Sequence, residues 1–200
     1  MNNLIDELIP KKTRTITAHL EKALIALGDN FPHKKEIKRT AERLTSVWIE
    51  MSKSSTSSPP KLKWFPTDFR SLMIKGPIES YFLCPHHLLP VTAKTIIGMV
   101  PNGYTLGISK ISRIVSWACN RFELQEDITK LIADNLWEVQ ECYKPKGLIV
   151  SMIGDHFCEK IRGIKQKSPT QTVEMRGNVT AEELFLFNAR INQDQFVIER

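Results

Sequence analysis

The sequence predicts an α+β fold in which an N-terminal helical part precedes a domain of strands and helices. Three observations indicate this class. Apolar residues recur at three- and four-residue spacings early in the chain, strand-like runs rich in Val, Ile and Thr come later, and a polar segment with two prolines separates them. We therefore predict an N-terminal helical region with a linker over residues 1–60, and a second domain over residues 61–200.

Two helices are expected in the N-terminal region, over residues 13–28 and 34–52. The second carries apolar side chains at three- and four-residue spacings on one face: Ile37, Ala41, Leu44, Val47, Trp48 and Met51. The segment MSKSSTSSPP, residues 51–60, then breaks the pattern with small polar residues and two prolines. Since such a segment has no face to bury, it is predicted to be a flexible linker.

The second domain alternates strand and helix signals. Short β-branched runs predict strands at 72–75, 78–83, 91–100, 105–109, 148–157 and about 169–177. The PNGY turn after residue 100 favours a hairpin between the strands on either side of it. Apolar periodicity predicts helices at about 110–120 and 125–143, and TAEELFLFNARI predicts a closing helix that starts at a threonine cap.

Composition narrows the class of protein. The formal net charge of +6 favours an anionic partner, which could be nucleic acid, a membrane surface or a phosphorylated small molecule. No apolar run approaches the roughly 18 residues of a membrane span, and the N-terminus lacks the order of a signal peptide. We therefore expect a cytoplasmic protein whose four cysteines are reduced thiols.

The stretch YFLCPHHLLP, residues 81–90, sets a thiol and two imidazoles between apolar segments. Cys84 and His87 have a Cys-x-x-His spacing, which lets one tight turn direct sulfur and nitrogen at a common point. Cys158 is a candidate third ligand that a neighbouring strand could deliver. Thiolate and imidazole favour zinc, and three protein ligands would leave the fourth position to water. The spacing alone does not exclude an ordinary core cysteine and histidine.

Two more histidines accompany these candidates. On a strand, residues two apart share a face, so His156 would lie beside Cys158 and point into the same cavity. An imidazole is suited to proton transfer near neutral pH, which makes His86 and His156 candidate acid/base groups. Cys119 and Cys142 fall within predicted helices and are expected to pack in the core.

A basic cluster lies at a predicted strand-to-helix junction. GISKISRIV, residues 107–115, places Ser109, Lys110 and Arg113 where helix amides and the helix dipole favour phosphate. A solvated basic face is the alternative. Arg162, four residues beyond Cys158, and Arg43, on the second helix, are further candidates for anion contacts.

LQEDITKL opens the long helix with Gln125, Glu126 and Asp127. Acidic residues at a helix start ordinarily complement the dipole, and we favour that role for Asp127. The pattern leaves Gln125 and Glu126 open. A carboxylate could accept hydrogen bonds from an amidine-like pair of N–H groups, such as the edge of guanine.

Taken together, these motifs resemble the GTP cyclohydrolase I family of the tunnelling-fold group. The resemblance runs from RTAERLTSVW through LCPHHLLP, GISKISRIV, LQEDITKLIA and DHFCEKIRG to the final EELFLF. It implies a tunnelling fold, an antiparallel sheet with helices on one face, for the catalytic domain. It also implies a zinc-dependent conversion of GTP to 7,8-dihydroneopterin triphosphate and formate, the first step of tetrahydrofolate- or pterin-type biosynthesis.

The resemblance further implies a role for each matched residue. The zinc ligands would be Cys84, His87 and Cys158, and the acid/base histidines would be His86 and His156. The residues that recognise guanine would be Gln125 and Glu126, and a serine near the ribose would be Ser109. The triphosphate contacts would be Lys110, Arg113, Arg162 and, less closely matched, Arg43. Family members form a homodecamer of two pentameric rings with shared sites, so Gln125 and Glu126 would serve a zinc held by another chain.

Two positions depart from the family pattern. Pro85 replaces a usual glutamate, which removes a carboxylate and a backbone N–H, and Ala41 replaces a usual proline. Pro85 leaves the rate and the substrate range open. One alternative is therefore a divergent member that takes another purine nucleotide or stops at a ring-opened product. A remote alternative is a basic zinc protein that binds nucleic acid. Because a second pair of zinc ligands and an aromatic-rich basic strand are lacking, we expect neither a nucleic-acid nor a membrane partner.

Overall fold

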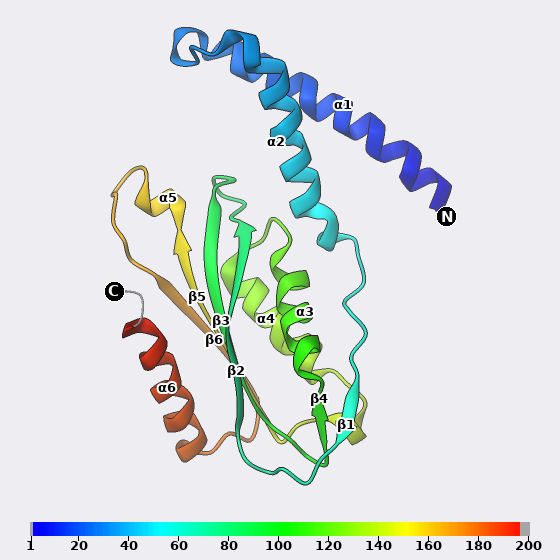
Figure 1. Cartoon of the computed structure of the whole chain (residues 1–200), viewed down its shortest axis with the longest axis vertical. Coiled ribbons are helices and arrows are strands. Elements are labelled where there is room, and N and C mark those ends of the chain that lie inside the picture. Colours follow the sequence, from blue (N-terminus) through cyan, green and yellow to red (C-terminus); the bar gives the residue numbers. More distant parts are fainter. Residues whose placement is uncertain (1, 197–200) are drawn as a thin grey trace. The chain divides into compact units, whose positions relative to one another are not determined.

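A computed structural model of the chain describes residues 2–196, with side chains described for residues 11–193. The chain divides into two compact units, Met1–Lys53 and Ser54–Arg200. The first unit contains helices α1 (Asn2–Ala26) and α2 (Ile37–Ser52), which confirms the predicted helix pair (Figure 1). The two helices pack through their polar as well as apolar residues, because the Thr17 hydroxyl donates to the buried Thr45 hydroxyl at 3.0 Å.

The second unit is built on a four-stranded antiparallel sheet with the order β2-β3-β5-β6 (Figure 1). Its strands are β2 (Met73–Leu83), β3 (Pro90–Val100), β5 (Gly147–His156) and β6 (Thr170–Gly177). The two strands predicted at 72–75 and 78–83 are one strand, β2, whose register shifts between Lys75 and Ile78. Pro77 lies in this shift, where its missing N–H costs no ladder hydrogen bond.

The predicted hairpin around PNGY is wrong. Strand β4 (Tyr104–Leu106) pairs with β1 (Trp64–Pro66) in a separate two-stranded sheet, and β1 was not predicted. The physical reason is that β3 is an inner strand, with β2 bonded to one edge and β5 to the other. Once the chain leaves β3 it has no free edge to fold back on.

Alternation along the central strands divides the core between the two faces of the sheet. Val91, Ala93, Ile97 and Met99 of β3 face helices α3 (Ile108–Cys119) and α4 (Gln125–Trp137) in the larger core cluster. On the other face, Ile96 packs with residues of helix α6 (Ala181–Phe196). The predicted α+β class is therefore confirmed, and α6 adds a partial cover on the second face (Figure 1).

Local hydrogen bonds set the start of α6, whereas contacts distant in sequence set the end of α4. The threonine cap predicted for α6 is confirmed: Thr180 and Glu183 exchange side chain to backbone hydrogen bonds of 2.8 and 3.2 Å, which is a capping box. Helix α4 ends at Trp137 rather than at residue 143. Beyond it, Tyr143 stacks on Trp64 at 5.7 Å and meets Tyr104 edge-on at 5.0 Å, so aromatic packing draws this segment away from the helix axis.

The segment predicted as a flexible linker makes specific contacts where it enters the second unit. After the short helix η3 (Lys53–Ser55), the indole N–H of Trp117 donates to the Ser57 carbonyl at 3.2 Å. The Arg121 guanidinium donates to the Ser54 carbonyl at 3.3 Å and stacks over the Trp117 ring. Residues 54–57 are thereby attached to α3. Within the described part of the chain, no helix is long and apolar enough to cross a membrane.

The packing of α6 yields a stability test that uses two phenylalanines of one helix. Phe187 is 1% exposed and Phe185 is 72% exposed. Phe187→Ala should lower the free energy of unfolding by about 3–5 kcal/mol, because it leaves a cavity against Ile96 and Ile149. Phe185→Ala should change it by less than about 1 kcal/mol. Chemical denaturation of both variants measures the difference, and equal losses would contradict this placement of α6.

Candidate active site

The loop between β2 and β3 carries the Cys-x-x-His motif, and backbone hydrogen bonds fix its base. The Cys84 N–H donates to the Leu89 carbonyl at 3.1 Å, and the Cys84 carbonyl accepts the Leu88 N–H at 2.9 Å. Leu88 adopts the left-handed conformation, with φ of 53°, which closes the loop. Cys84 is therefore held at the first position of a short, defined turn.

Within this turn, Cys84 and His86 come together. The Cys84 thiol is buried, and its Sγ lies 3.8 Å from Nδ1 of His86. His87 and Pro85 are exposed in the same turn. The imidazole beside the thiol is thus that of His86, whereas the Cys-x-x-His spacing predicted a common point for Cys84 and His87, which stays a prediction.

His156 reaches the same end of the sheet on a different strand. Val91 of β3 pairs with Phe82 of β2 on one side and with His156, the last residue of β5, on the other. The Phe82 and His156 rings meet edge-on with centroids 6.2 Å apart. Strand pairing therefore places His156 level with Phe82, which is two residues before Cys84, on the other side of β3.

The predicted placement of Cys158 on the strand is wrong. Strand β5 ends at His156, and Cys158 lies in the short helix α5 (Phe157–Lys160). Strand alternation therefore does not set the direction of its side chain. Cys158 is partly buried and still follows His156 at the Cys84 end of the sheet.

Gln125, the first residue of α4, connects His156 to the sheet. Its side chain is 2% exposed, and its Oε1 lies 3.1 Å from Nε2 of His156. Its Nε2 group donates to the carbonyls of Met152 and Thr170 at 3.1 and 2.9 Å, and lies 3.2 Å from the Thr172 hydroxyl. The side chain thus lies beside the histidine of its own chain, which differs from the expectation that Gln125 serves a neighbour's site.

Sequence reasoning missed the glycine that makes this contact possible. A Cβ at Gly154 would lie 2.0 Å from Oε1 of Gln125, so only glycine leaves room for the amide against β5. A glycine inside a strand often marks such a close approach, and this was the available signal.

The donor set at this end of the sheet suits zinc. Cys84, His87 and Cys158 offer two sulfurs and one imidazole nitrogen, and the buried Cys84 thiol lies 3.8 Å from the ring of His86, which is outside this set. Among the described residues, no three His, Cys, Asp or Glu side chains are grouped closely enough to hold a metal ion. The three-ligand set therefore stays a prediction.

The residues predicted to grip phosphate lie at the other end of α3. Ser109, Lys110 and Arg113 occupy its first two turns, and Ser109 and Arg113 are exposed. The end of α3 adjoins the Cys84 loop, because the Leu83 N–H donates to the Arg121 carbonyl at 3.3 Å. At 1.5 Å per residue, the helix separates the two groups by about 15 Å. In one chain the two groups therefore lie at opposite ends of α3.

The remaining predicted contacts are exposed. Glu126 follows Gln125 at the start of α4, near the Cys84 loop, and its side chain reaches solvent. Arg162 is exposed just beyond α5, and Arg43 is exposed on α2 in the first compact unit. Their contacts with a substrate stay predictions.

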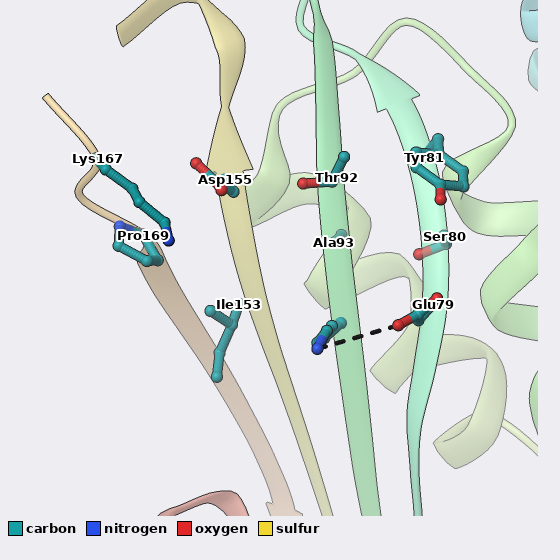
Figure 2. Close-up of a pocket in the computed structure, with 10 residues that line it drawn as sticks. Glu79, Ser80, Tyr81, Thr92, Ala93, Ile153, Asp155, Lys167 and Pro169 are labelled. Carbon is teal, nitrogen blue, oxygen red and sulfur yellow. Dashed lines mark ion pairs between the residues drawn. The ribbon is translucent and has the colours of Figure 1, made fainter. Parts of the chain in front are cut away.

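A cavity of about 270 Å³ lies on the opposite face of the sheet. Figure 2 shows Tyr81, Thr92 and Asp155 across the strands at one level of it, with the Glu79–Lys94 ion pair below. None of the predicted site residues lines this cavity. The face with Phe82 and His156 and the face with the cavity are thus distinct surfaces.

Two cysteines lie outside the candidate site. Cys119 is buried as predicted, and burial raises the pKa of its thiol to about 11, against smaller lowering effects of a Ser80 hydrogen bond and the Arg121 charge. The core position predicted for Cys142 is wrong. That residue is exposed, because α4 ends five residues before it.

Comparison of the sequence with known proteins finds a matching family and several relatives. Residues 16–186 match the sequence profile of the family described as GTP cyclohydrolase I. The GTP cyclohydrolase 1 of Deinococcus radiodurans is 34% identical over 158 residues, which cover 77% of this chain and 71% of that protein. The GTP cyclohydrolase 1 of Coxiella burnetii is 32% identical over 86% of this chain and 93% of its own, and that of Bacteroides thetaiotaomicron is 28% identical over 86% and 88%.

Alkylation tests the burial of Cys119 and the exposure of Cys142, the two cysteines outside the candidate site. At pH 8, iodoacetamide should modify Cys142 quickly and leave Cys119 unmodified. A pKa of about 11 leaves roughly one Cys119 thiol in a thousand ionised at that pH, and the thiolate is the reactive form. Peptide mass spectrometry measures both rates, with unfolded protein as the control in which both react. Equal rates in the folded protein would contradict the burial of Cys119.

Proposed function

The chain belongs to the GTP cyclohydrolase I family of hydrolases, and on that premise we propose that it converts GTP to 7,8-dihydroneopterin triphosphate and formate with the help of zinc. The observation that carries the proposal is the convergence of the Cys84 loop and His156 on one end of the sheet. Candidate acid/base and metal-ligating groups lie there at the ends of β2 and β5, the two neighbours of β3, as hydrolysis of a stable purine ring requires.

Cys84, His87 and Cys158 would hold the metal. When bound, zinc would supply Lewis-acid activation of water near neutral pH. Cys84 is the best supported of the three, since its thiol is buried and its backbone is fixed on both sides by the loop. Cys158 follows His156 by two residues, so the two are delivered by one segment.

His86 and His156 would move protons. The reaction consumes one water overall, releases C8 of the purine as formate and closes a new ring after rearrangement of the ribose. Protons must therefore be exchanged at the purine imidazole ring and at the ribose ring oxygen. His86 is exposed in the loop, whereas His156 is held by Phe82 and Gln125, so the two imidazoles differ in freedom.

The substrate would be gripped by residues from two regions. Glu126, exposed at the start of α4, suits the amidine edge of guanine, and the resemblance of the LQEDITKL motif implies the same role for Gln125. Ser109 would lie by the ribose. The triphosphate contacts would be Lys110, Arg113, Arg162 and Arg43. The start of α3 lies about 15 Å from the Cys84 loop in one chain, and we propose that a second copy completes the site.

The sheet offers edges for such an assembly. In the part of the chain described, β2 and β6 are the outer strands, and the β6 side chains Val173 and Met175 are 49% and 51% exposed. Long edge strands with exposed apolar residues favour pairing with another chain. We propose the homodecamer of two pentameric rings that the family match implies, acting in the cytoplasm in pterin-type biosynthesis.

Product analysis tests the proposed reaction. The purified protein, incubated with GTP, should release formate and 7,8-dihydroneopterin triphosphate in equal amounts, identified by mass. Cys84→Ser should lose both turnover and bound zinc, and Cys119→Ser should keep both, because Cys119 lies in the core away from the loop. A ring-opened final product, or turnover of another purine nucleotide alone, would favour the divergent alternative. Full turnover without metal would contradict the zinc proposal.

A mixing experiment tests the shared site. Arg113→Ala and Cys84→Ser should each be nearly inactive alone, and after subunit exchange about a quarter of the sites should pair two intact halves. The matched control mixes His156→Ala with Cys84→Ser. Both of these residues lie at the same end of one chain, so that mixture should recover nothing. Equal recovery, or no recovery, in both mixtures would contradict a site divided in this way.

A further inference from the structure

The Gln125 amide has a role that recognition of guanine does not explain. Its side chain is buried, and each of its polar atoms has a partner inside the same chain. An amide used to read a purine would need an unpaired donor or acceptor facing the substrate. The Gln125 side chain is instead enclosed between the end of β5, the start of β6 and His156.

The two carbonyls on one side of the amide fix which way it points. A main-chain carbonyl only accepts hydrogen bonds, so the groups near Met152 and Thr170 must face the NH₂ end of the amide. The opposite orientation would set Oε1 against two carbonyl oxygens, neither of which can donate a hydrogen bond to it. Oε1 of Gln125 therefore faces His156.

This orientation determines the tautomer of His156. Oε1 can only accept, so Nε2 of His156, 3.1 Å away, must carry the proton. In the neutral imidazole, Nδ1 then holds the lone pair. The Phe82 ring, edge-on at 6.2 Å, restricts rotation of the imidazole about this hydrogen bond.

Neighbouring groups hold the amide in place. The Thr129 hydroxyl donates to the Gln125 carbonyl at 2.8 Å and lies 2.6 Å from the Thr172 hydroxyl, which in turn adjoins the amide. Gly154 supplies the space, since any Cβ there would collide with Oε1. A buried polar network in which every member is paired is rigid and therefore suited to orient another side chain.

We propose that Gln125 is a positioning residue that holds His156 as the Nε2–H tautomer and thereby makes Nδ1 the atom that exchanges protons with the substrate. This inference rests on the proposed role of His156 in proton transfer. In this inference the Gln125 side chain does not recognise guanine. It acts by orienting His156. Glu126, which is exposed, is left to read the base.

Nitrogen NMR tests the tautomer directly. The chain has five histidines, so sedimented protein labelled with ¹⁵N-histidine gives a simple solid-state spectrum, in which His156→Ala identifies the signals of His156. The spectra are compared for the neutral imidazole, whose two nitrogens give separate signals for N–H and lone pair. We expect a proton on Nε2 and a lone pair on Nδ1. A proton on Nδ1 in the unmodified protein would overturn the proposal.

Two substitutions then remove the amide contact in different ways. Gln125→Met keeps the length of the side chain and loses its hydrogen bonds, and Gly154→Ala displaces Oε1 with a methyl group. Both should give signals of both tautomers for His156. The matched control is Gln171→Met, since Gln171 lies on the opposite face of the same strand pair and bonds to Ser151. Its His156 signals should be unchanged.

Kinetics separates positioning from recognition. With GTP, Gln125→Met and Gly154→Ala should lower kcat about tenfold or more and leave KM within about twofold. A large rise in KM with unchanged kcat and an unchanged His156 spectrum would mean that Gln125 contacts guanine, and would overturn the inference. If Gln125→Met does not fold, Gly154→Ala decides alone. Absence of GTP turnover in the unmodified protein would contradict the proposed function, while the NMR test of the tautomer would still stand.

Discussion

The pairing of β3 with β2 on one edge and β5 on the other is the constraint on which the candidate site depends. Because Val91 pairs with both Phe82 and His156, these two residues lie level with each other on either side of β3, and the loop after β2 and the end of β5 lie at the same end of the sheet. The same alternation buries the face of β3 that α3 and α4 cover. The strand register that builds the core thus also sets the thiol and the imidazoles at one end of the sheet.

Helix α4 adds what strand pairing cannot supply, namely a fixed orientation for a histidine. Its first residue, Gln125, reaches across Gly154 and ties His156 to the carbonyls of β5 and β6. Burying an amide is unfavourable unless its hydrogen bonds are satisfied, and here they are. A structural requirement, full pairing of a buried side chain, therefore coincides with control over one nitrogen of the proposed acid/base group.

Local patterns predicted the elements better than their ends and partners. Periodicity found the helices and the strands of the main sheet, because it depends on neighbouring residues. The Cys-x-x-His spacing pointed to His87, whereas the imidazole beside the Cys84 thiol is that of His86. The end of α4, the partner of β4 and the helical position of Cys158 depend on contacts distant in sequence, such as Tyr143 with Trp64. The Gln125 network joins residues from three elements, and its only signal in the sequence is Gly154, a glycine within a strand.

The start of α3 and the Cys84 loop lie about 15 Å apart in one chain, and the proposal that two copies share each site makes assembly central to this account. Sedimentation velocity combined with GTP turnover across a range of protein concentrations tests this most directly. The account predicts that activity per chain follows the fraction of assembled protein and is lost as dilution produces single chains. A single chain that sediments as a monomer and retains full GTP turnover would contradict it.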